Sequence, residues 1–161
     1  MGKRRVLFAS AAVVAAGIGA GGIATAHGHD ERFHVTLRGQ FEVPPADPDG
    51  KATARVEINL DDGQVCFDLR FDRIGTPTMA HIHGPNGPAG TNAGILVWFF
   101  GPGHDPDGGP INPDDLERGR AEGCTHFDKV ALADVVENPD DYYVNIHNTR
   151  FGSGAVRGQL D

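Results

Sequence analysis

Residues 52–71, ATARVEINLDDGQVCFDLRF, contain two runs of alternating apolar and polar side chains joined by a turn. From Ala52 to Leu60 every second residue is apolar, and the same holds from Val65 to Phe71. Successive side chains of a β-strand point to opposite faces, so each run predicts a strand with one buried face. The sequence Asp61-Asp62-Gly63 between them is typical of a tight hairpin turn. The stretch therefore predicts an antiparallel β-hairpin.

The period of two recurs along the chain. It predicts further strands over 33–37, 94–100, 142–147 and 155–160. The run 94–100 is apolar at nearly every position, so we expect both of its faces to be covered and Trp98 to lie in the core.

Helical signals are few. Asn112 followed by Pro113 resembles the start of a short helix, and residues 128–137 predict a second one that ends before Pro139. We predict an all-β protein, an Ig-like antiparallel β-sandwich with one or two short helices.

The N-terminus has the organisation of a secretory signal. Lys3, Arg4 and Arg5 precede an apolar stretch over 6–23, and Ala24-Thr25-Ala26 has the small residues of a cleavage site. We predict a signal peptide over 1–26, a flexible mature N-terminus over 27–32 and one domain over 33–161. An uncleaved membrane anchor is the alternative. The expected location is secreted, or periplasmic and cell-envelope.

Charge and cysteine content narrow the partners. The formal net charge is −8, and it becomes more negative when the basic residues of the signal are removed. An acidic chain repels phosphate backbones and has no polybasic patch for lipid, so we expect no nucleic acid and no membrane contact after signal cleavage. Cys66 and Cys124 are the two cysteines, and export predicts a disulfide between them, with two free thiols as the alternative.

The main chemical signal is a set of histidines. In Ala80-His81-Ile82-His83-Gly84, strand alternation places His81 and His83 on one side, where two imidazoles can converge on a metal ion. Near the end of the chain, Val144 and Ile146 occupy the buried face, so His147 points outward with Asn145. The same reasoning turns Arg157 outward. If these strands are neighbours, surface histidines His81, His83 and His147 share one face with Arg157.

The chain resembles the CHRD domain over most of its mature length. The resemblance rests on five segments: Gly39–Pro45 (GQFEVPP), Met79–Gly84 (MAHIHG), Gly94–Val97 (GILV), Tyr143–His147 (YVNIH) and Gly154–Leu160 (GAVRGQL). The family is named after chordin, an extracellular antagonist of signalling ligands. Single-domain bacterial members are common, and this chain resembles that type; membership fixes no activity.

A fainter resemblance is to copper/zinc superoxide dismutase. The order of His81, His83, His147 and Arg157 is similar to the copper ligands and the arginine of that family, which implies a superoxide-dismutase-like sandwich and a copper site. Counterparts of the zinc-loop ligands are absent. All-imidazole ligation suits copper, with zinc as the other candidate metal.

Further residues are candidates for the same site. His126 and His104 are candidate fourth ligands, and Arg157 is the candidate catalytic residue, expected to lie behind the metal ligands and to attract a small anion such as superoxide to an open copper position. Cleavage after residue 26 would also expose His27-Gly28-His29, a separate square-planar copper motif.

Two hypotheses follow. The chain is an exported copper-binding protein, redox-active in a dismutase-like way, or a non-enzymatic extracellular binding or scaffold module without metal that binds a protein partner. The sequence does not decide whether it is an enzyme.

Overall fold

Eight strands form a single antiparallel sheet in the computed structural model, which describes residues 30–161. The predicted signal peptide and the His27-Gly28-His29 motif lie outside the described residues. The strands are β1 (Asp30–Arg38), β2 (Lys51–Asn59), β3 (Gln64–Asp72), β4 (Pro77–His83), β5 (Ile95–Phe100), β6 (Arg120–His126), β7 (Tyr143–Asn148) and β8 (Val156–Gln159). Their order in the sheet is β5-β4-β7-β8-β1-β2-β3-β6.

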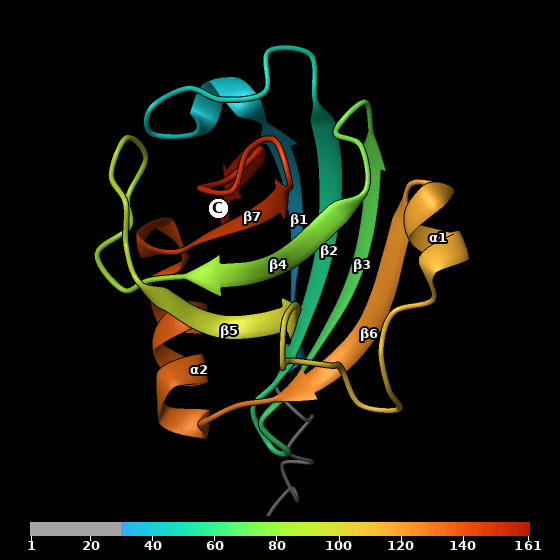
Figure 1. The fold of residues 1–161 in the computed structure, drawn as a ribbon. Coiled ribbons are helices and arrows are strands. Elements are labelled where there is room, and N and C mark those ends of the chain that lie inside the picture. Colours follow the sequence, from blue (N-terminus) through green and yellow to red (C-terminus); the bar gives the residue numbers. More distant parts are fainter. Residues whose placement is uncertain (1–29) are drawn as a thin grey trace, which may run out of the picture.

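The sheet curls so that its two parts face each other across the core. In Figure 1, β4, β5 and β7 cross in front of β1, β2 and β3. The rings of Phe67 on β3 and Phe99 on β5 stack across this space with centroids 4.7 Å apart. The all-β prediction is confirmed, and the two layers of the sandwich are joined into one sheet.

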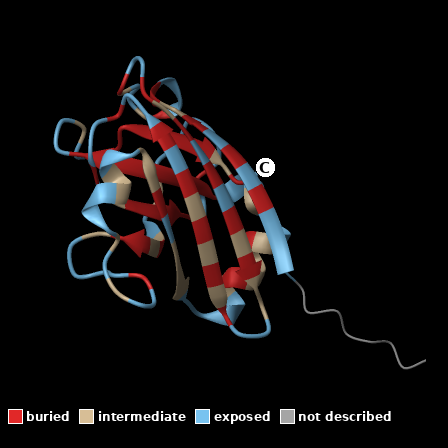
Figure 2. Cartoon of the chain, turned by 90° about the vertical axis from the view of Figure 1, so that its right-hand side faces the viewer, coloured by how far each residue is buried: buried red, intermediate tan, exposed pale blue. Residues whose placement is uncertain are grey.

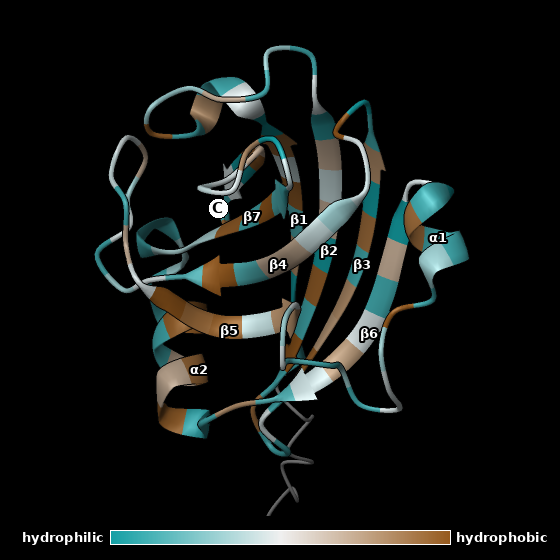
Figure 3. Cartoon of the chain, viewed as in Figure 1, coloured by the Kyte–Doolittle hydropathy of each residue, from teal (hydrophilic) through white to brown (hydrophobic). Residues whose placement is uncertain are grey.

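The predicted hairpin is present, and it shows why these residues form strands. β2 pairs with β3 along its whole length: Lys51 lies opposite Asp72 at one end and Asn59 opposite Gln64 at the other, next to the turn that connects the two strands. Val56, Phe67 and their neighbours at every second position are buried. Figure 2 shows this alternation of buried and more exposed residues along the strands, and Figure 3 shows the matching alternation of hydropathy. We use "outer face" for the face of the sheet that points away from this core.

Two α-helices occur where the sequence predicts them. Helix α1 (Pro113–Glu117) begins after Asn112, whose side chain accepts a hydrogen bond from the backbone of Asp114. Helix α2 (Lys129–Glu137) closes one side of the core with Leu132 and Val135. Two 3₁₀ turns, η1 (Gly39–Phe41) and η2 (Pro139–Asp141), complete the fold.

Three details differ from the sequence prediction. β1 begins at Asp30, so residues 30–32, expected in a flexible N-terminus, pair with β2. β5 is not covered on both faces, because Ile95 is 42% exposed and Trp98 lies half-buried on the outer face. β6 was not predicted, since its sequence RAEGCTH has no alternating pattern and buries only Ala121.

The Cys66–Cys124 disulfide is confirmed. The two residues are direct partners in the pairing of β3 with β6, and their sulfurs are bonded. This bond fits a protein of an oxidising compartment. Among residues 30–161, no helix has the length and apolar character needed to cross a bilayer.

Candidate metal centre

The sheet order brings the predicted strands together. β7 lies between β4 and β8, with Asn145 of β7 opposite His81 on one side and Arg157 on the other. Because Ile82, Val144 and Val156 point into the core, the histidines and Arg157 all point to the outer face. We call the outer face of β4, β7 and β8 the covered half, and the outer face of β1, β2 and β3 the open half.

His81, His83 and His147 form a compact group in the covered half. The ring centroid of His81 lies 4.6 Å from that of His83 and 4.6 Å from that of His147. One ligand nitrogen from each of the three rings lies within 4.8 Å of the others. Three equivalent nitrogens bound to one ion at about 2.0–2.1 Å are at most about 3.6 Å apart, so inward movements of up to about 0.7 Å by each ring would bring all three into bonding range.

The prediction that these histidines are at the surface is wrong. His81 is 0% exposed, His83 8% and His147 5%. Alternation correctly turned them away from the core, but loops cover them: the carbonyl oxygens of Ala93 and Gly152, from two different loops, contact His83 and His147. Alternation along a strand predicts the side of the sheet on which a side chain lies, but it does not predict whether a loop covers that side.

These loop carbonyls determine which ring nitrogens can bind a metal. His83 Nδ1 lies 2.8 Å from the Ala93 oxygen, and His147 Nδ1 lies 3.0 Å from the Gly152 oxygen. A carbonyl only accepts hydrogen bonds, so each Nδ1 donates. Burial lowers the pKa of both rings, so they are neutral and each Nε2 has a free lone pair.

Both of these Nε2 atoms lie close to Asn145 Oδ1, at 3.1 and 3.0 Å. An oxygen cannot donate a hydrogen bond to their lone pairs, so a half turn of the side chain, which places the NH₂ group there, is the assignment that satisfies both rings. A hydrogen bond at Nδ1 that leaves Nε2 free is the usual arrangement of a metal-binding histidine.

His81 has no such partners. Both of its ring nitrogens are buried without a hydrogen bond. Burial lowers its pKa to about 2, and the neighbouring rings of His83 and His147 act in the same direction. A buried polar atom without a partner costs about 1–3 kcal/mol, and His81 is a neutral imidazole whose N–H has no acceptor and whose lone pair has no donor.

Residues 33–160 match the sequence model of the family described as CHRD domain. The chain belongs to the CHRD family. No curated protein and no solved structure matches the chain. The resemblance to superoxide dismutase therefore remains one of ligand order.

The segments that mark the CHRD family gather in the covered half. Met79–Gly84 and Tyr143–His147 supply the three histidines, and Gly154–Leu160 supplies Arg157. Gly39–Pro45 supplies Glu42, which the sequence did not single out. It is 5% exposed, and its carboxyl group packs against Gly154 at a point where a β-carbon would lie 2.4 Å from Oε1.

Arg157 contacts the site only through Tyr143. Its guanidinium carbon lies 3.8 Å from the centroid of the Tyr143 ring, and the His83 ring stacks on Tyr143 with centroids 4.6 Å apart. Since Tyr143 is on the strand between them, its ring separates Arg157 from His83. Arg157 is 1% exposed, and one aromatic ring, that of Tyr143, lies between its guanidinium and the His83 ring. Tyr143 itself was missed, because a tyrosine in a strand has no distinctive spacing.

The two candidate fourth ligands are not part of the group. His126 is on β6, where its Nδ1 lies 2.9 Å from a carboxylate oxygen of Asp107. His104 is exposed and stacks on Trp98 with centroids 4.2 Å apart, and Trp98 in turn meets His81 edge-on at 4.8 Å. Trp98 therefore lies between His104 and the three ligands and not in the core.

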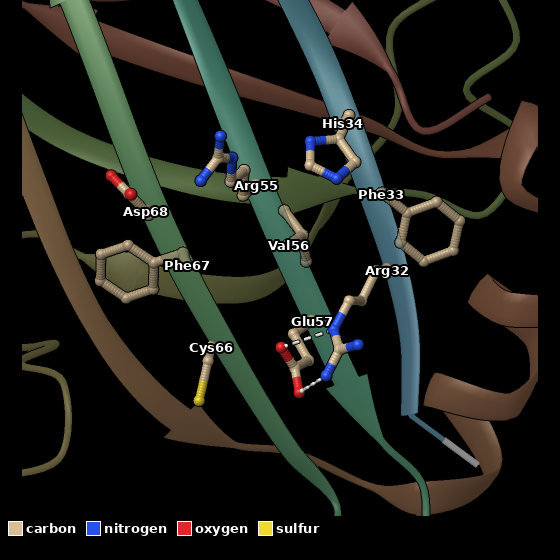
Figure 4. Close-up of a pocket in the computed structure, with 9 residues that line it drawn as sticks. All are labelled: Arg32, Phe33, His34, Arg55, Val56, Glu57, Cys66, Phe67 and Asp68. Atoms are coloured by element: carbon tan, nitrogen blue, oxygen red, sulfur yellow. Dashed lines mark hydrogen bonds and ion pairs between the residues drawn. The ribbon is translucent and has the colours of Figure 1, made fainter.

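A pocket lies over the open half, and its side chains differ in chemistry from the histidine group of the covered half. Figure 4 shows it across β1, β2 and β3, with the Arg32–Glu57 ion pair at one end and Arg55 and His34 at the other. His34, Arg32 and Arg55 are exposed, whereas the three histidines of the covered half are buried. In this CHRD domain, of the residues described, the only group of three or more metal-binding side chains is His81, His83 and His147.

Proposed function

We propose that the chain is an exported protein that binds one copper ion through His81, His83 and His147. The observation that carries this proposal is the His81 imidazole, which is fully buried with both nitrogens unpaired. Beside it are two imidazoles whose Nε2 atoms both face the side-chain amide of Asn145, which an ion would replace as the partner of their lone pairs. An ion bound there would take up these lone pairs.

The donor set supports a transition metal. Three neutral nitrogen ligands suit Cu(II) and Zn(II), and copper has the higher affinity for a given set of ligands. Calcium and magnesium prefer oxygen ligands, which the group does not supply. Export is supported by the disulfide and by the signal-like residues 1–26.

The burial of the site limits what can react there. A bound copper ion would supply one-electron chemistry, and with His81 fully covered only a small species such as superoxide could reach it. The dismutase-like part of the proposal therefore depends on movement of the loops that carry Ala93 and Gly152.

Copper titration tests the proposal. The background is the full chain with His27→Ala and His29→Ala, because the N-terminal motif can bind copper by itself. We expect one Cu(II) per chain, bound more tightly than micromolar, with nitrogen hyperfine structure in the electron paramagnetic resonance spectrum. His81→Gln or His147→Ala should weaken binding by more than about 100-fold, since losing even a hydrogen bond to a ligand costs roughly 10–100-fold.

His126→Ala is the matched control, because His126 is an exposed histidine outside the group, and it should bind copper like the background. Zn(II) titrated in parallel decides the metal. Equal binding of micromolar strength or weaker by all variants would refute the proposal and favour the alternative, an extracellular binding module that holds no metal.

A further inference from the structure

A cavity lies where β8 of the covered half meets β1 of the open half, and none of His81, His83 and His147 lines it. It has a volume of about 700 Å³ and is bounded by β1, β8, the segment 40–45 and the loop residues Ala89 and Gly90. This volume is typical of sites for small organic ligands. The two buried ionisable residues on its lining are Arg157 and Glu42.

Arg157 is a buried cation without an ion pair. Its guanidinium donates hydrogen bonds to the Thr91 carbonyl at 2.7 Å, to Asn92 Oδ1 at 3.2 Å and to Gln159 Oε1 at 3.5 Å. All three acceptors are neutral, and no carboxylate of residues 30–161 lies within ion-pair distance. A guanidinium has five N–H donors, so donors remain for a further acceptor. Burying such a charge is costly unless an anion accompanies it.

Glu42 is the nearest candidate for that anion, but it does not form the pair. Its Oε1 is buried and has no hydrogen-bond partner. Burial raises the pKa of Glu42 to about 7, and the charge of Arg157 only partly opposes this. Gly154 leaves room for the carboxyl group, because any larger residue there would collide with it. At one cavity, therefore, the Arg157 guanidinium lacks an anion and Glu42 Oε1 lacks a hydrogen-bond donor.

The rest of the lining adds an apolar surface. Phe41 is 45% exposed, and Val43 and Pro45 continue the same wall. An exposed aromatic ring next to polar side chains suits the apolar face of a sugar ring. Asp161 at the rim is exposed, so its charge is screened by water, whereas Arg157 is not screened.

We propose that this cavity binds a small hydroxylated organic acid of the uronic acid type. The ligand carboxylate pairs with Arg157, a ligand hydroxyl donates to Glu42, and the ring packs on Phe41. The proposal does not depend on copper, because none of the three histidines lines the cavity.

Calorimetric titration of the metal-free full chain with D-glucuronate tests the site, with neutral D-glucose as the matched ligand. We expect saturable one-to-one binding of glucuronate and at least tenfold weaker binding of glucose. Ala89→Trp, at an exposed position of the rim, should abolish binding by filling the cavity. Phe41→Ala should weaken it severalfold.

Val130→Trp is the control, because Val130 is 79% exposed on α2, away from the cavity. It should bind glucuronate like the unaltered chain. Equal binding of glucuronate and glucose, or unchanged binding by Ala89→Trp, would overturn the proposal. Since copper binding is measured separately, failure of this site leaves the result for the histidines unaffected.

Discussion

The outward side chains of β1, β2 and β3 lie in water and pair as ions, whereas those of β4, β7 and β8 are buried beneath loops. In the open half, Arg32 and Glu57 pair across two strands with side chains 63% and 43% exposed. In the covered half, His81 and Arg157 hold corresponding outward positions and are 0% and 1% exposed. The same alternation of inward and outward side chains thus leaves the outward residues in water in the open half and buries them in the covered half.

This difference shows where function is to be sought in the fold. Exposed ion pairs contribute little to stability and cost little to place. Buried imidazoles, a buried guanidinium and a buried carboxyl group are each unfavourable unless they have partners. A domain that keeps all of them under loops retains unsatisfied groups that need an explanation, and the two proposals above offer bound ligands as that explanation.

The largest expected difference between the halves is in the free energy of unfolding at low pH, which the buried histidines of the covered half should lower. Burial holds the folded-state pKa of His81 at about 2, below the ordinary value of 6.5, so its contribution to stability is present above pH 6.5 and lost as the pH falls. By pH 4.5 His81 alone should cost about 3 kcal/mol of the free energy of unfolding. His83 and His147 act in the same direction.

Urea unfolding of metal-free protein between pH 7 and pH 4.5 measures this loss. His81→Gln should remove about 3 kcal/mol of it. His34→Gln makes the same change in the open half. If His34→Gln flattened the pH profile and His81→Gln did not, the assignment of the acid sensitivity to the covered half would be wrong.

Glu42 should have a smaller effect on stability, and one with the opposite pH dependence to that of His81. Its pKa is raised by burial from 4.5 to about 7 in the folded state, so ionisation opposes folding as the pH rises above 4.5. Glu42→Gln mimics the protonated form and should stabilise the protein at pH 8 by on the order of 2 kcal/mol, with no gain at pH 4. Thermal unfolding at the two pH values tests this, and an equal effect at both would contradict it.

The smallest effect is expected from the ion pair of the open half. The hydrogen bond and charge of Arg32 lower the pKa of Glu57, so the pair stabilises the fold above pH 4.5 and loses this contribution below it. Because both side chains are largely exposed, Glu57→Gln should lower the melting temperature at pH 7 only slightly, and 1 M salt should abolish the difference. A large loss that persists in salt would contradict the contrast between the halves.

The alternation of apolar and polar residues was sufficient to predict most of the strands from the sequence. The hairpin of β2 and β3, the helix caps at Asn112 and Asp128 and the pairing of the two cysteines follow from local signals. β6 could not be predicted, since a strand that buries one alanine has no periodic pattern.

The candidate site was only partly accessible to sequence reasoning. Spacing identified His81, His83 and His147, because strand geometry fixes the side on which each lies. Their burial depends on loop carbonyls such as that of Ala93, which have no signature in side-chain types. Proximity to Cys124 suggested His126 as a ligand, but adjacency in sequence does not place a residue on the right strand.

The disulfide has a consequence for the edge of the sheet. β5 and β6 are the edge strands of the described sheet, and an unpaired edge can add strands from another chain. β6, the strand with the weakest hydrophobic pattern, is also the one attached covalently to its neighbour, through Cys124 and Cys66. The disulfide thus attaches to the sheet a strand that buries almost no apolar surface. In a reducing compartment β6 would lose this covalent link and would be held by its backbone hydrogen bonds, by exposed ion pairs such as Arg70–Glu122 and by the burial of Ala121, so we expect the edge strand to separate from β3 more easily there.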